Sequence, residues 1–233
     1  MRNQQTSRHQ VSNVMQARRS IRAYLPTPVA ADIIEQILQD AARAPSGSNI
    51  QPWKVHVLQG ATLEKLTGLT CQAFDEANAN AQQHKPEYDY YPPSLFEPYL
   101  ARRRKVGWDL YSLLEITKGD KRKMQAQHRK NFAFFGAPVG LLFTINRALS
   151  QGSWLDYGMF LQNVMLAAQA QGLSTCPQAA WIDYHRIIAD VLDLPPEEQL
   201  VCGIALGYGD PNAVENSLVS ERADLQEFVT WHV

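Results

Sequence analysis

The sequence predicts a fold in which helices and strands alternate, and three observations carry that prediction. Apolar residues at helical spacing form a stripe through residues 30–43, which is typical of a helix packed on one face. Residues 154–171 are apolar almost all round, which is typical of a central, buried helix. Short apolar or alternating runs predict strands over 54–58, 139–145, 173–176 and 200–208. Taken alone, this alternation indicates a parallel, doubly wound sheet.

Length and charge place the chain among ordinary globular proteins. It has 233 residues, with 22 Lys+Arg against 23 Asp+Glu and a net charge of -1. Because there is no basic excess, nucleic acid is not favoured as a partner. Hydrophobic residues make up 45% and charged residues 19% of the chain, which excludes a disordered or fibrous protein. We expect a single domain over 1–233.

Cysteine usage and the apolar runs favour a cytoplasmic protein. Cys71, Cys176 and Cys202 lie far apart and form no CxxC pair, so no metal site and no thioredoxin-type redox motif is expected. Such usage is typical of the reducing cytosol. The polar N-terminus lacks the apolar stretch of a signal peptide. The longest apolar run, 137–145, is far shorter than the roughly 18 residues that suggest a membrane span.

The N-terminal elements are predicted from the residues that interrupt them. Residues 1–12 look like a loose arm, followed by a short helix that ends at Arg18. The helix over 30–43 ends at Ala44, because the residue before a proline avoids helical backbone. After the strand over 54–58, another helix is expected from 61 to about 82.

The middle of the chain, 84–134, has the least regular composition. Its first part, 84–98, holds four prolines and is rich in tyrosine, so we expect an ordered loop. Helices are predicted over 95–116 and 120–134. Ten Lys/Arg stand against three Asp/Glu between 101 and 130. Such a run is typical of a solvated face, although Arg102, Arg103 and Arg104 could also attract an acidic substrate or a phosphate group, and its role is left open.

The C-terminal half contains none of the common nucleotide or catalytic motifs. The strand over 200–208 leads into a loop, and no GxGxxG opens a helix after a strand, so a Rossmann fold is poorly supported. P-loop, HExxH and GxSxG sequences are absent. Asp183 is expected to cap a helix that runs through Leu192. Residues 209–233 look like an irregular tail with a tryptophan near its end.

The run Arg18-Arg19-Ser20-Ile21-Arg22 is the first candidate site. It places three guanidinium groups and one hydroxyl within five residues. A guanidinium presents a planar fork of donors that matches phosphate oxygens, and the hydroxyl adds another donor. The run therefore suits a phosphate, although a solvated basic patch has the same composition.

Two further segments combine small polar residues with an aromatic one. The loop 44–53, APSGSNIQPW, offers backbone N–H groups and amide side chains to a flat polar ligand, or forms a tight turn that satisfies itself. The segment 175–181, TCPQAAW, ends a strand in proline and small residues. Such residues let a ligand approach the backbone, or they simply connect a strand to a helix. Cys176 is expected to be a small buried hydrophobe.

The motifs ARRSIR, APSGSNIQPW and LGYGDP followed by an arginine resemble, at this spacing, the nitroreductase family of FMN-dependent oxidoreductases. The resemblance covers residues 10–233. It implies an α+β fold in place of the doubly wound one, with a mixed, largely antiparallel central sheet flanked by helices. It also implies a homodimer. In that dimer, 209–233 would embrace the partner and add a strand to its sheet, and 84–134 would form a variable cap over the substrate.

The resemblance gives each motif a role. Arg18, Ser20 and Arg222 would hold the FMN phosphate, with Arg19 nearby, and many relatives have a lysine where this chain has Ser220. Arg22 would reach toward N1 and O2 of the flavin ring. The loop residues would border the flavin across the subunit boundary, and a backbone N–H of 177–180 would bond N5. The implied cofactor-binding residues are Arg18, Arg19, Ser20, Arg22, Pro45, Ser46, Asn49, Gln51, Pro177, Gln178, Ala179, Ala180 and Arg222.

The chemistry implied by the resemblance is hydride transfer. NADH or NADPH would reduce FMN at N5, and a nitroaromatic or quinone-like acceptor would then take the hydride in a ping-pong cycle. No catalytic side chain is implied, because the flavin carries the chemistry. The aromatic residues of 88–111 would wall the acceptor pocket or pack in the dimer. Reductive dehalogenation, enone reduction and flavin destruction on the same scaffold remain open, as does a non-catalytic flavin- or anion-binding module.

Overall fold

The computed structural model describes residues 2–80 and 84–233, without the side chains of residues 2–9. A four-stranded sheet with strand order β1-β2-β4-β3 forms its centre. The strands are β1 (Lys54–Leu58), β2 (Val139–Asn146), β3 (Ser174–Gln178) and β4 (Glu198–Gly207). All three strand pairs are antiparallel. The parallel, doubly wound sheet that alternation indicates is therefore wrong, because alternation does not fix strand direction, and the α+β fold is confirmed.

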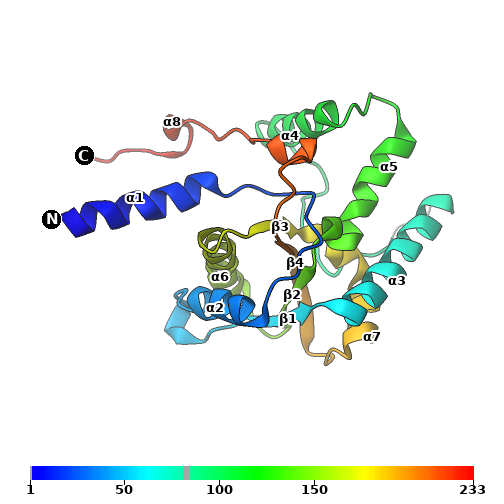
Figure 1. Cartoon of the computed structure of the whole chain (residues 1–233), viewed down its shortest axis with the longest axis horizontal. Coiled ribbons are helices and arrows are strands. Elements are labelled where there is room, and N and C mark those ends of the chain that lie inside the picture. The colour runs from blue at the N-terminus through cyan, green and yellow to red at the C-terminus, as the bar shows by residue number, and fades with distance from the viewer. Residues whose placement is uncertain (1, 81–83) are drawn as a thin grey trace.

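Helices cover both faces of the sheet (Figure 1). On one face lie α2 (Ala31–Ala41) and α6 (Gln151–Ala170), and on the other α3 (Gly60–Ala79) and α7 (His185–Leu192). Each face has its own apolar cluster. A strand covered on both faces must be apolar throughout, which explains why β2 is buried over nearly its whole length. The position of α6 against the sheet agrees with its all-round apolar sequence.

The segment predicted as two helices over 95–116 and 120–134 forms shorter elements. The first, α4 (Tyr99–Leu113), begins only after Pro98, which has no backbone N–H to donate. The second, α5 (Lys121–Arg129), is capped by Asp120, whose side chain accepts from Lys123 N–H at 3.0 Å. A 3₁₀ segment over Lys130–Gly136 follows, in which two consecutive phenylalanines have positive φ. Left-handed backbone cannot continue an α-helix, so α5 ends early.

The N-terminus differs from the sequence prediction. The loose arm expected over 1–12 is wrong where the structure describes it, because α1 spans Arg2–Ala17. No proline or glycine lies between residues 2 and 17, so nothing in the sequence interrupts a helix. Helix α3 ends at Ala79, and the predicted extension to about 82 reaches into 81–83, outside the described residues.

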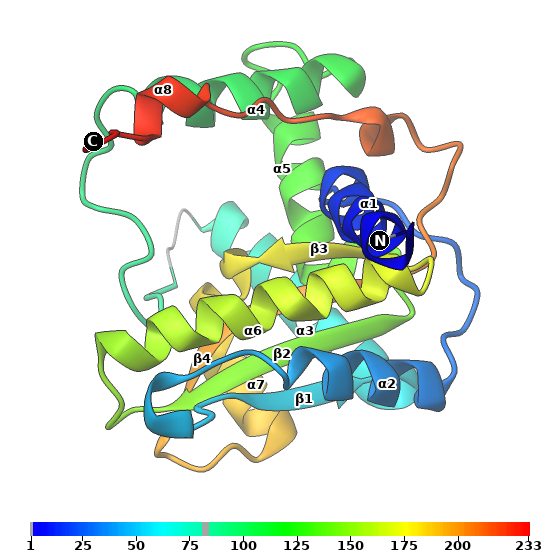
Figure 2. The same cartoon turned by 90° about the vertical axis from the view of Figure 1, so that its left-hand side faces the viewer.

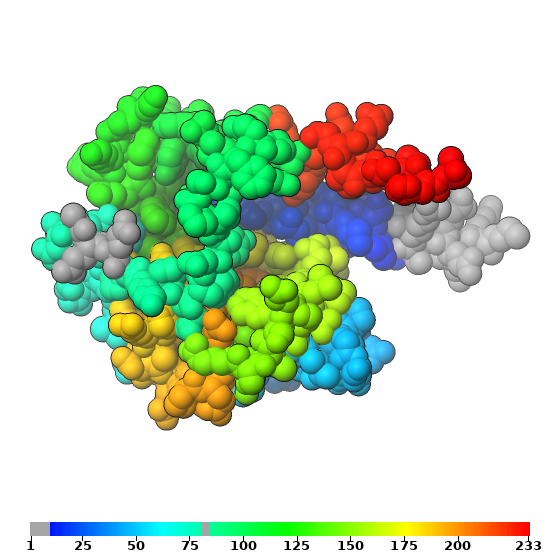
Figure 3. Space-filling model, turned by 180° about the vertical axis from the view of Figure 1, so that it is seen from behind, coloured from blue at the N-terminus to red at the C-terminus, as the bar shows by residue number. Residues whose placement is uncertain are grey.

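The C-terminal segment is irregular, as predicted, apart from a 3₁₀ turn over Val214–Ser217 and the short α8 (Leu225–Phe228). It runs beside α4 (Figure 2). The tail and α1 extend from the body on the same side, and the space-filling view shows the tail protruding (Figures 1 and 3). A 3₁₀ segment over Ala179–Tyr184 precedes α7, which starts at His185 and not at Asp183. In the described part of the chain, no helix is long and apolar enough to cross a membrane.

A buried carboxylate ties β4 to its neighbours. Glu198 accepts hydrogen bonds from Thr144 Oγ1 at 2.6 Å and from Lys54 Nζ, and His56 Nε2 lies 3.3 Å away. Burial alone would raise the pKa of Glu198, but the hydrogen bonds from Lys54 and Thr144 outweigh it and lower the pKa below its usual value. The ionised form therefore stabilises the fold.

We expect Glu198→Gln to lower the free energy of unfolding by about 1–3 kcal/mol at pH 7. A depressed folded-state pKa gives stability that is present above the unfolded pKa and is lost as pH falls through the folded one. The difference between the two proteins should therefore shrink on acidification. Urea unfolding from pH 7 down to pH 3 measures it, with exposed Glu197→Gln as the control. An equal difference at both ends of the pH range would contradict this role.

Candidate flavin site

Four arginines converge on one cavity of about 430 Å³. The segment after α1 supplies Arg18, Arg19, Ser20 and Arg22, and the tail supplies Ser220 and Arg222. No acidic residue occurs among the described residues that line it. Guanidinium and hydroxyl donors without a competing carboxylate are suited to a phosphate group. The structure thus brings together the first predicted motif and the C-terminal arginine, and we call this space the basic cavity.

Backbone contacts to the sheet fix the arginine run. Ser20 forms a parallel bridge with Thr175 of β3, and Ile21 N–H donates to the Thr175 carbonyl at 3.0 Å. Asn216 holds the other end, because its Oδ1 accepts from Arg22 N–H at 2.8 Å and from Ala23 N–H at 3.2 Å. The arginines therefore stand on a rigid edge of the sheet.

Electrostatics in the basic cavity favour an anion. Burial and the neighbouring Arg222 charge both lower the pKa of Arg18. Like charges held this close repel each other, and an anion between them relieves the repulsion. Cys176 lies beside this cluster, and burial raises the pKa of its thiol to about 11 in spite of Arg22 and Arg18. It is a protonated buried thiol at neutral pH, which confirms the expectation of a small buried hydrophobe.

A second cavity, of about 480 Å³, opens where β3 ends. Its lining on one side is the predicted segment Pro177, Gln178, Ala179 and Ala180. Other walls come from the proline- and tyrosine-rich loop, from α4 and from the end of α5. We call it the aromatic cavity. These further lining residues are Pro86, Tyr88, Asp89, Tyr90, Tyr91, Arg103, His128, Asn131, Ile182 and Asp183.

Gln178 carries an unsatisfied polar atom at the edge of the aromatic cavity. The residue is 3% exposed, and its Nε2 donates to the Asn131 carbonyl at 2.7 Å. Its Oε1 is buried and has no partner within the described residues. An acceptor left unpaired in a folded protein is costly, so a donor brought by a ligand would be stabilising.

One strand connects the two cavities. Thr175 of β3 pairs with Ser20 beside the basic cavity, and Gln178, three residues on, lines the aromatic cavity. Three strand residues span roughly 10 Å. A ligand with a phosphate at one end, a short polar chain and a flat ring at the other fits this arrangement, and FMN has those three parts.

The loop with Pro45, Ser46, Asn49 and Gln51 lies apart from both cavities. None of its residues lines either one. Gly47 N–H donates to Asp156 of α6 at 3.0 Å, and Ser46 Oγ accepts from Gln51 N–H at 3.0 Å. Asn49 and Gln51 are exposed, with φ values of 58° and 48°. Within one subunit the loop does not reach the cavities, so its contact with a cofactor across a subunit boundary stays a prediction.

Arg22 lies on the basic cavity, and its contact with a flavin ring stays a prediction. It lines the basic cavity, and its Nη1 donates to the Ser20 carbonyl at 3.1 Å. It is not among the residues that line the aromatic cavity. A contact with the ring edge of a flavin would require this side chain to exchange the Ser20 carbonyl for the ring.

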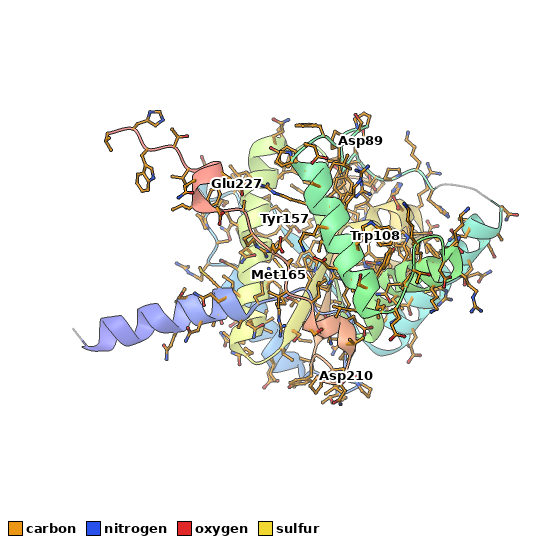
Figure 4. The ribbon with its side chains drawn as sticks, turned by 90° about the horizontal axis from the view of Figure 1, so that it is seen from above. Asp89, Trp108, Tyr157, Met165, Asp210 and Glu227 are labelled. Carbon is orange, nitrogen blue, oxygen red and sulfur yellow. The ribbon has the colours of Figure 1, made fainter. Side chains whose placement is uncertain are left out.

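The predicted aromatic wall divides into two sets. Tyr88, Tyr90 and Tyr91 line the aromatic cavity. Their neighbours along the chain pair with one another instead, Phe96 with Tyr99 and Trp108 with Tyr111. Figure 4 shows α4 from above, with Trp108 along it and Asp89 near its N-terminal end. None of the second set is among the residues lining the cavity.

Three important residues were missed from the sequence. Asn216 Oδ1 accepts a hydrogen bond from the backbone N–H of Arg22, 194 positions away in the chain, and no local pattern indicates such a contact. Asn131 offers Gln178 its backbone carbonyl, a group every residue has. Trp181 directly follows Pro177–Ala180, the segment predicted to line a flavin ring, which we call the ring-lining segment. It is fully buried and stacks on Phe134 at 4.3 Å between centroids. Its position after AA in TCPQAAW is the one available signal.

Comparison with known proteins adds three kinds of finding. A model of the Nitroreductase family matches residues 15–208. A 4-nitrobenzoate reductase of Pseudomonas putida is 43% identical over 215 residues, which cover 92% of this chain and 92% of the relative. The solved structure of the FMN- and NADPH-dependent nitroreductase NfnB from Sphigopyxis sp. strain HMH has a TM-score of 0.91 and 35% identity, covering 96% of this chain and 99% of that one. The FMN-dependent NfnB of Mycobacterium smegmatis, in complex with NADPH, has a TM-score of 0.88 and 28% identity, with 97% and 99% covered.

Proposed function

The chain belongs to the nitroreductase family, and from that premise we propose that it is an FMN-dependent oxidoreductase that reduces nitroaromatic compounds with NADPH or NADH. One observation carries the proposal: β3 joins a cavity lined by four arginines to a cavity with aromatic walls. A phosphate and a flat ring require those two environments at that spacing.

The residues that would hold FMN are those of the two cavities. Arg18, Arg222 and the Ser20 hydroxyl bind the phosphate, with Arg19 at the rim. Pro177–Ala180 support the ring, and backbone N–H groups of Ala179 or Ala180 bond its N5 edge. Gln178 Oε1, unpartnered in the described chain, accepts from the ligand. When bound, FMN supplies hydride transfer through N5 between nicotinamide and acceptor.

The side chains contribute position and charge. Arg22 exchanges its bond to the Ser20 carbonyl for N1 and O2 of the ring, where a cation favours negative charge. The aromatic cavity lies beside the ring-lining segment, so the reductant and the acceptor would use it in turn. Alternate use of one space is a ping-pong cycle. Flat acceptors, nitroaromatics and quinones alike, pack between the tyrosines.

Spectroscopy tests the proposed function. The purified protein should be yellow, and acid should release FMN and not FAD, because the four arginines form one cluster that suits a single terminal phosphate. NADPH or NADH should bleach the flavin bands without oxygen, and a nitroaromatic compound should restore them. A colourless protein that does not bind added FMN would contradict the proposal. A flavin that bleaches and recovers with a halogenated phenol or an enone, and not with any nitroaromatic, would favour the rival activities.

We also propose a homodimer in which the partner completes the site. Several large apolar side chains are exposed, among them Leu155 of α6 at 72% and Trp231 of the tail at 76%. Large exposed apolar surface marks an interaction site. The exposed loop with Asn49 and Gln51 has no ligand contact within its own subunit, and a partner's flavin would supply one. The embrace by 209–233 belongs to the same proposal.

Leu155→Arg should separate the dimer and reduce FMN content together. A charge at an apolar interface is left without a partner, whereas the same charge on a solvated surface is harmless. Sedimentation should give twice the chain mass for the wild type and the single chain mass for the variant. Leu69→Arg, at a position 41% exposed on α3, is the control that should keep both dimer and flavin. A flavin-loaded monomer of either variant would contradict the shared site.

A further inference from the structure

The aromatic cavity contains one strongly cationic side chain, and the proposed hydride transfer does not use it. Arg103 of α4 lies over the ring of Tyr91, with its guanidinium carbon 4.8 Å from the ring centroid. It is the single Lys or Arg among the described residues that line the cavity. The pyrrolidine, amide and alanine side chains of Pro177–Ala180 form another wall of the same space.

The neighbours of Arg103 on α4 are engaged elsewhere. Arg102 pairs with Glu227 of the tail at 2.7 Å, and Lys105 pairs with Glu221 at 3.1 Å and with Asp109 at 2.8 Å. These residues border a separate groove between α4 and the tail. Within the described residues, no carboxylate lies within 4.0 Å of the Arg103 nitrogens. Arg103 thus faces the cavity with its charge uncompensated by an ion pair.

Other titratable groups in the cavity do not neutralise Arg103. Asp183 is half-buried, and its pKa is raised by burial and opposed by His128 and His84. Arg103 is not among the charges that act on it. Asp89 is exposed and lies near the N-terminal end of α4 (Figure 4). With Asp89 and Asp183 against Arg103, the lining carries more negative than positive charge, so a general attraction for anions is not expected, and recognition must come from the local geometry of Arg103.

Stacking on Tyr91 leaves the guanidinium edge available. A guanidinium that covers an aromatic face through its own face keeps its N–H donors in the plane, pointing past the ring. A carboxylate accepts two such donors side by side. An aromatic acid that lies among the tyrosines can therefore place its carboxylate on Arg103 while the opposite end of its ring faces the flavin ring that Pro177–Ala180 would support.

We propose that Arg103 is a specificity-determining residue that binds the carboxylate of nitroaromatic acids. This inference rests on the proposed function of the same cavity. The carboxylate and the nitro group occupy opposite ends of the substrate ring, so the acid is held while the nitro group points to the ring-lining segment. Uncharged nitroaromatics enter the same cavity without this contact.

The test compares a charged substrate with a neutral one of the same shape. The FMN-loaded enzyme is assayed with 4-nitrobenzoate and with methyl 4-nitrobenzoate, as wild type, Arg103→Gln and Arg103→Lys. Because Arg103 is exposed, its loss should raise KM for the acid about 5- to 30-fold. The kcat for the acid and both constants for the ester should change less than about twofold, since uniform binding is removed. Arg103→Lys should restore part of the affinity, because it keeps the charge and loses the fork.

A binding measurement gives a readout that does not depend on turnover. In a calorimetric titration with benzoate, Arg103→Gln should have a dissociation constant about 5- to 30-fold higher than that of the wild type, as expected for the loss of one exposed charged pair. Arg104→Gln, the next residue on α4, lines neither the aromatic cavity nor the basic one and should match the wild type. Its unchanged affinity would exclude a general effect of net charge.

Two results would overturn the inference. In the first, Arg103→Gln has the same ratio of KM for the acid to KM for the ester as the wild type, and the same affinity for benzoate. If the wild type reduces nitroaromatics, this result leaves the proposed function intact. In the second, Arg103→Gln slows flavin bleaching by NADPH relative to the wild type, leaves bleaching by NADH unchanged and does not affect binding of the acid. That result would assign Arg103 to the 2′-phosphate of NADPH. If neither nitro compound is reduced by the wild type, the proposed function fails, and benzoate titration still decides whether Arg103 binds a carboxylate.

Discussion

Trp181→Ala is expected to lower the free energy of unfolding by about 3–5 kcal/mol, because it removes a fully buried indole from the centre of an aromatic cluster. The indole stacks on Phe134 at 4.3 Å between centroids and meets Phe132 edge-on at 5.9 Å. Gly203 of β4 lies directly against it, and a Cβ at that glycine would collide with the indole. The surroundings are therefore shaped to this side chain and cannot close over an alanine.

The control is Trp181→Phe. The indole Nε1 is buried without a partner in the described chain, so its removal relieves an unpaired donor while a ring remains. We expect this variant to lower the free energy of unfolding by about 1–2 kcal/mol, since a smaller cavity is left. Urea unfolding of both apoproteins measures the difference. Equal losses in the two variants would contradict a packing effect that grows with the size of the cavity left behind.

The same substitution should also weaken the flavin site. Trp181 directly follows Ala179 and Ala180, which line the aromatic cavity. Without the indole below, this backbone loses the surface that holds its N–H groups in place. The FMN dissociation constant of Trp181→Ala should therefore rise even where the variant is folded, as measured by fluorescence titration at low temperature.

Arg18→Ala should raise the FMN dissociation constant about 10- to 150-fold, the value of one charge-assisted hydrogen bond of about 1.5–3 kcal/mol. The effect should exceed that of Arg222→Ala. Arg18 is half-buried, whereas Arg222 is exposed and its Nη1 already donates to Ser220 Oγ at 2.8 Å. A donor held in a partly buried site is worth more than one in solvent.

The apoprotein separates a binding role from a folding role. Burial lowers the pKa of Arg18, and the nearby positive charge of Arg222 lowers it further, so the two guanidinium groups repel each other. Removing either charge should leave the apoprotein as stable as the wild type or slightly more stable, although FMN binding falls. Arg19→Ala, at an exposed position on the rim, is the matched control and should have a small effect on both. A clear loss of apoprotein stability in Arg18→Ala would mean that the arginine supports the fold.

The predictable part of this protein is local. The helix over 30–43, the strand over 54–58 and the basic run at Arg18–Arg22 can be read from periodicity and composition, and the structure contains all three. Strand direction could not be predicted from pattern, because a strand covered on both faces, such as β2, is apolar throughout even when its neighbours are antiparallel. The resemblance to a known family supplied it.

What the sequence could not give depends on contacts between distant segments. Asn216 reaches Arg22 and Ala23 only because the tail returns across the sheet edge. The 3₁₀ segment over Lys130–Gly136 replaces the end of a predicted helix because Phe134 and Phe135 turn left-handed to enter the core, a tertiary preference that overrides local propensity. Arg103 could be named as one of a basic run, but its place over Tyr91 needed the fold.

The single strand between the two cavities has a consequence for how such a protein evolves. A residue inserted into or deleted from β3 would turn every later side chain to the other face of the sheet and alter the spacing of the cavities. If FMN spans the two cavities as proposed, the geometry of this one ligand fixes the length of β3. The tyrosine-rich loop and α4, by contrast, lie in a separate stretch of chain, and Arg103 stands on their surface. Substitutions there can change which acceptor is preferred without altering the strand that would position FMN. The substrate range can therefore change while the cofactor site is kept.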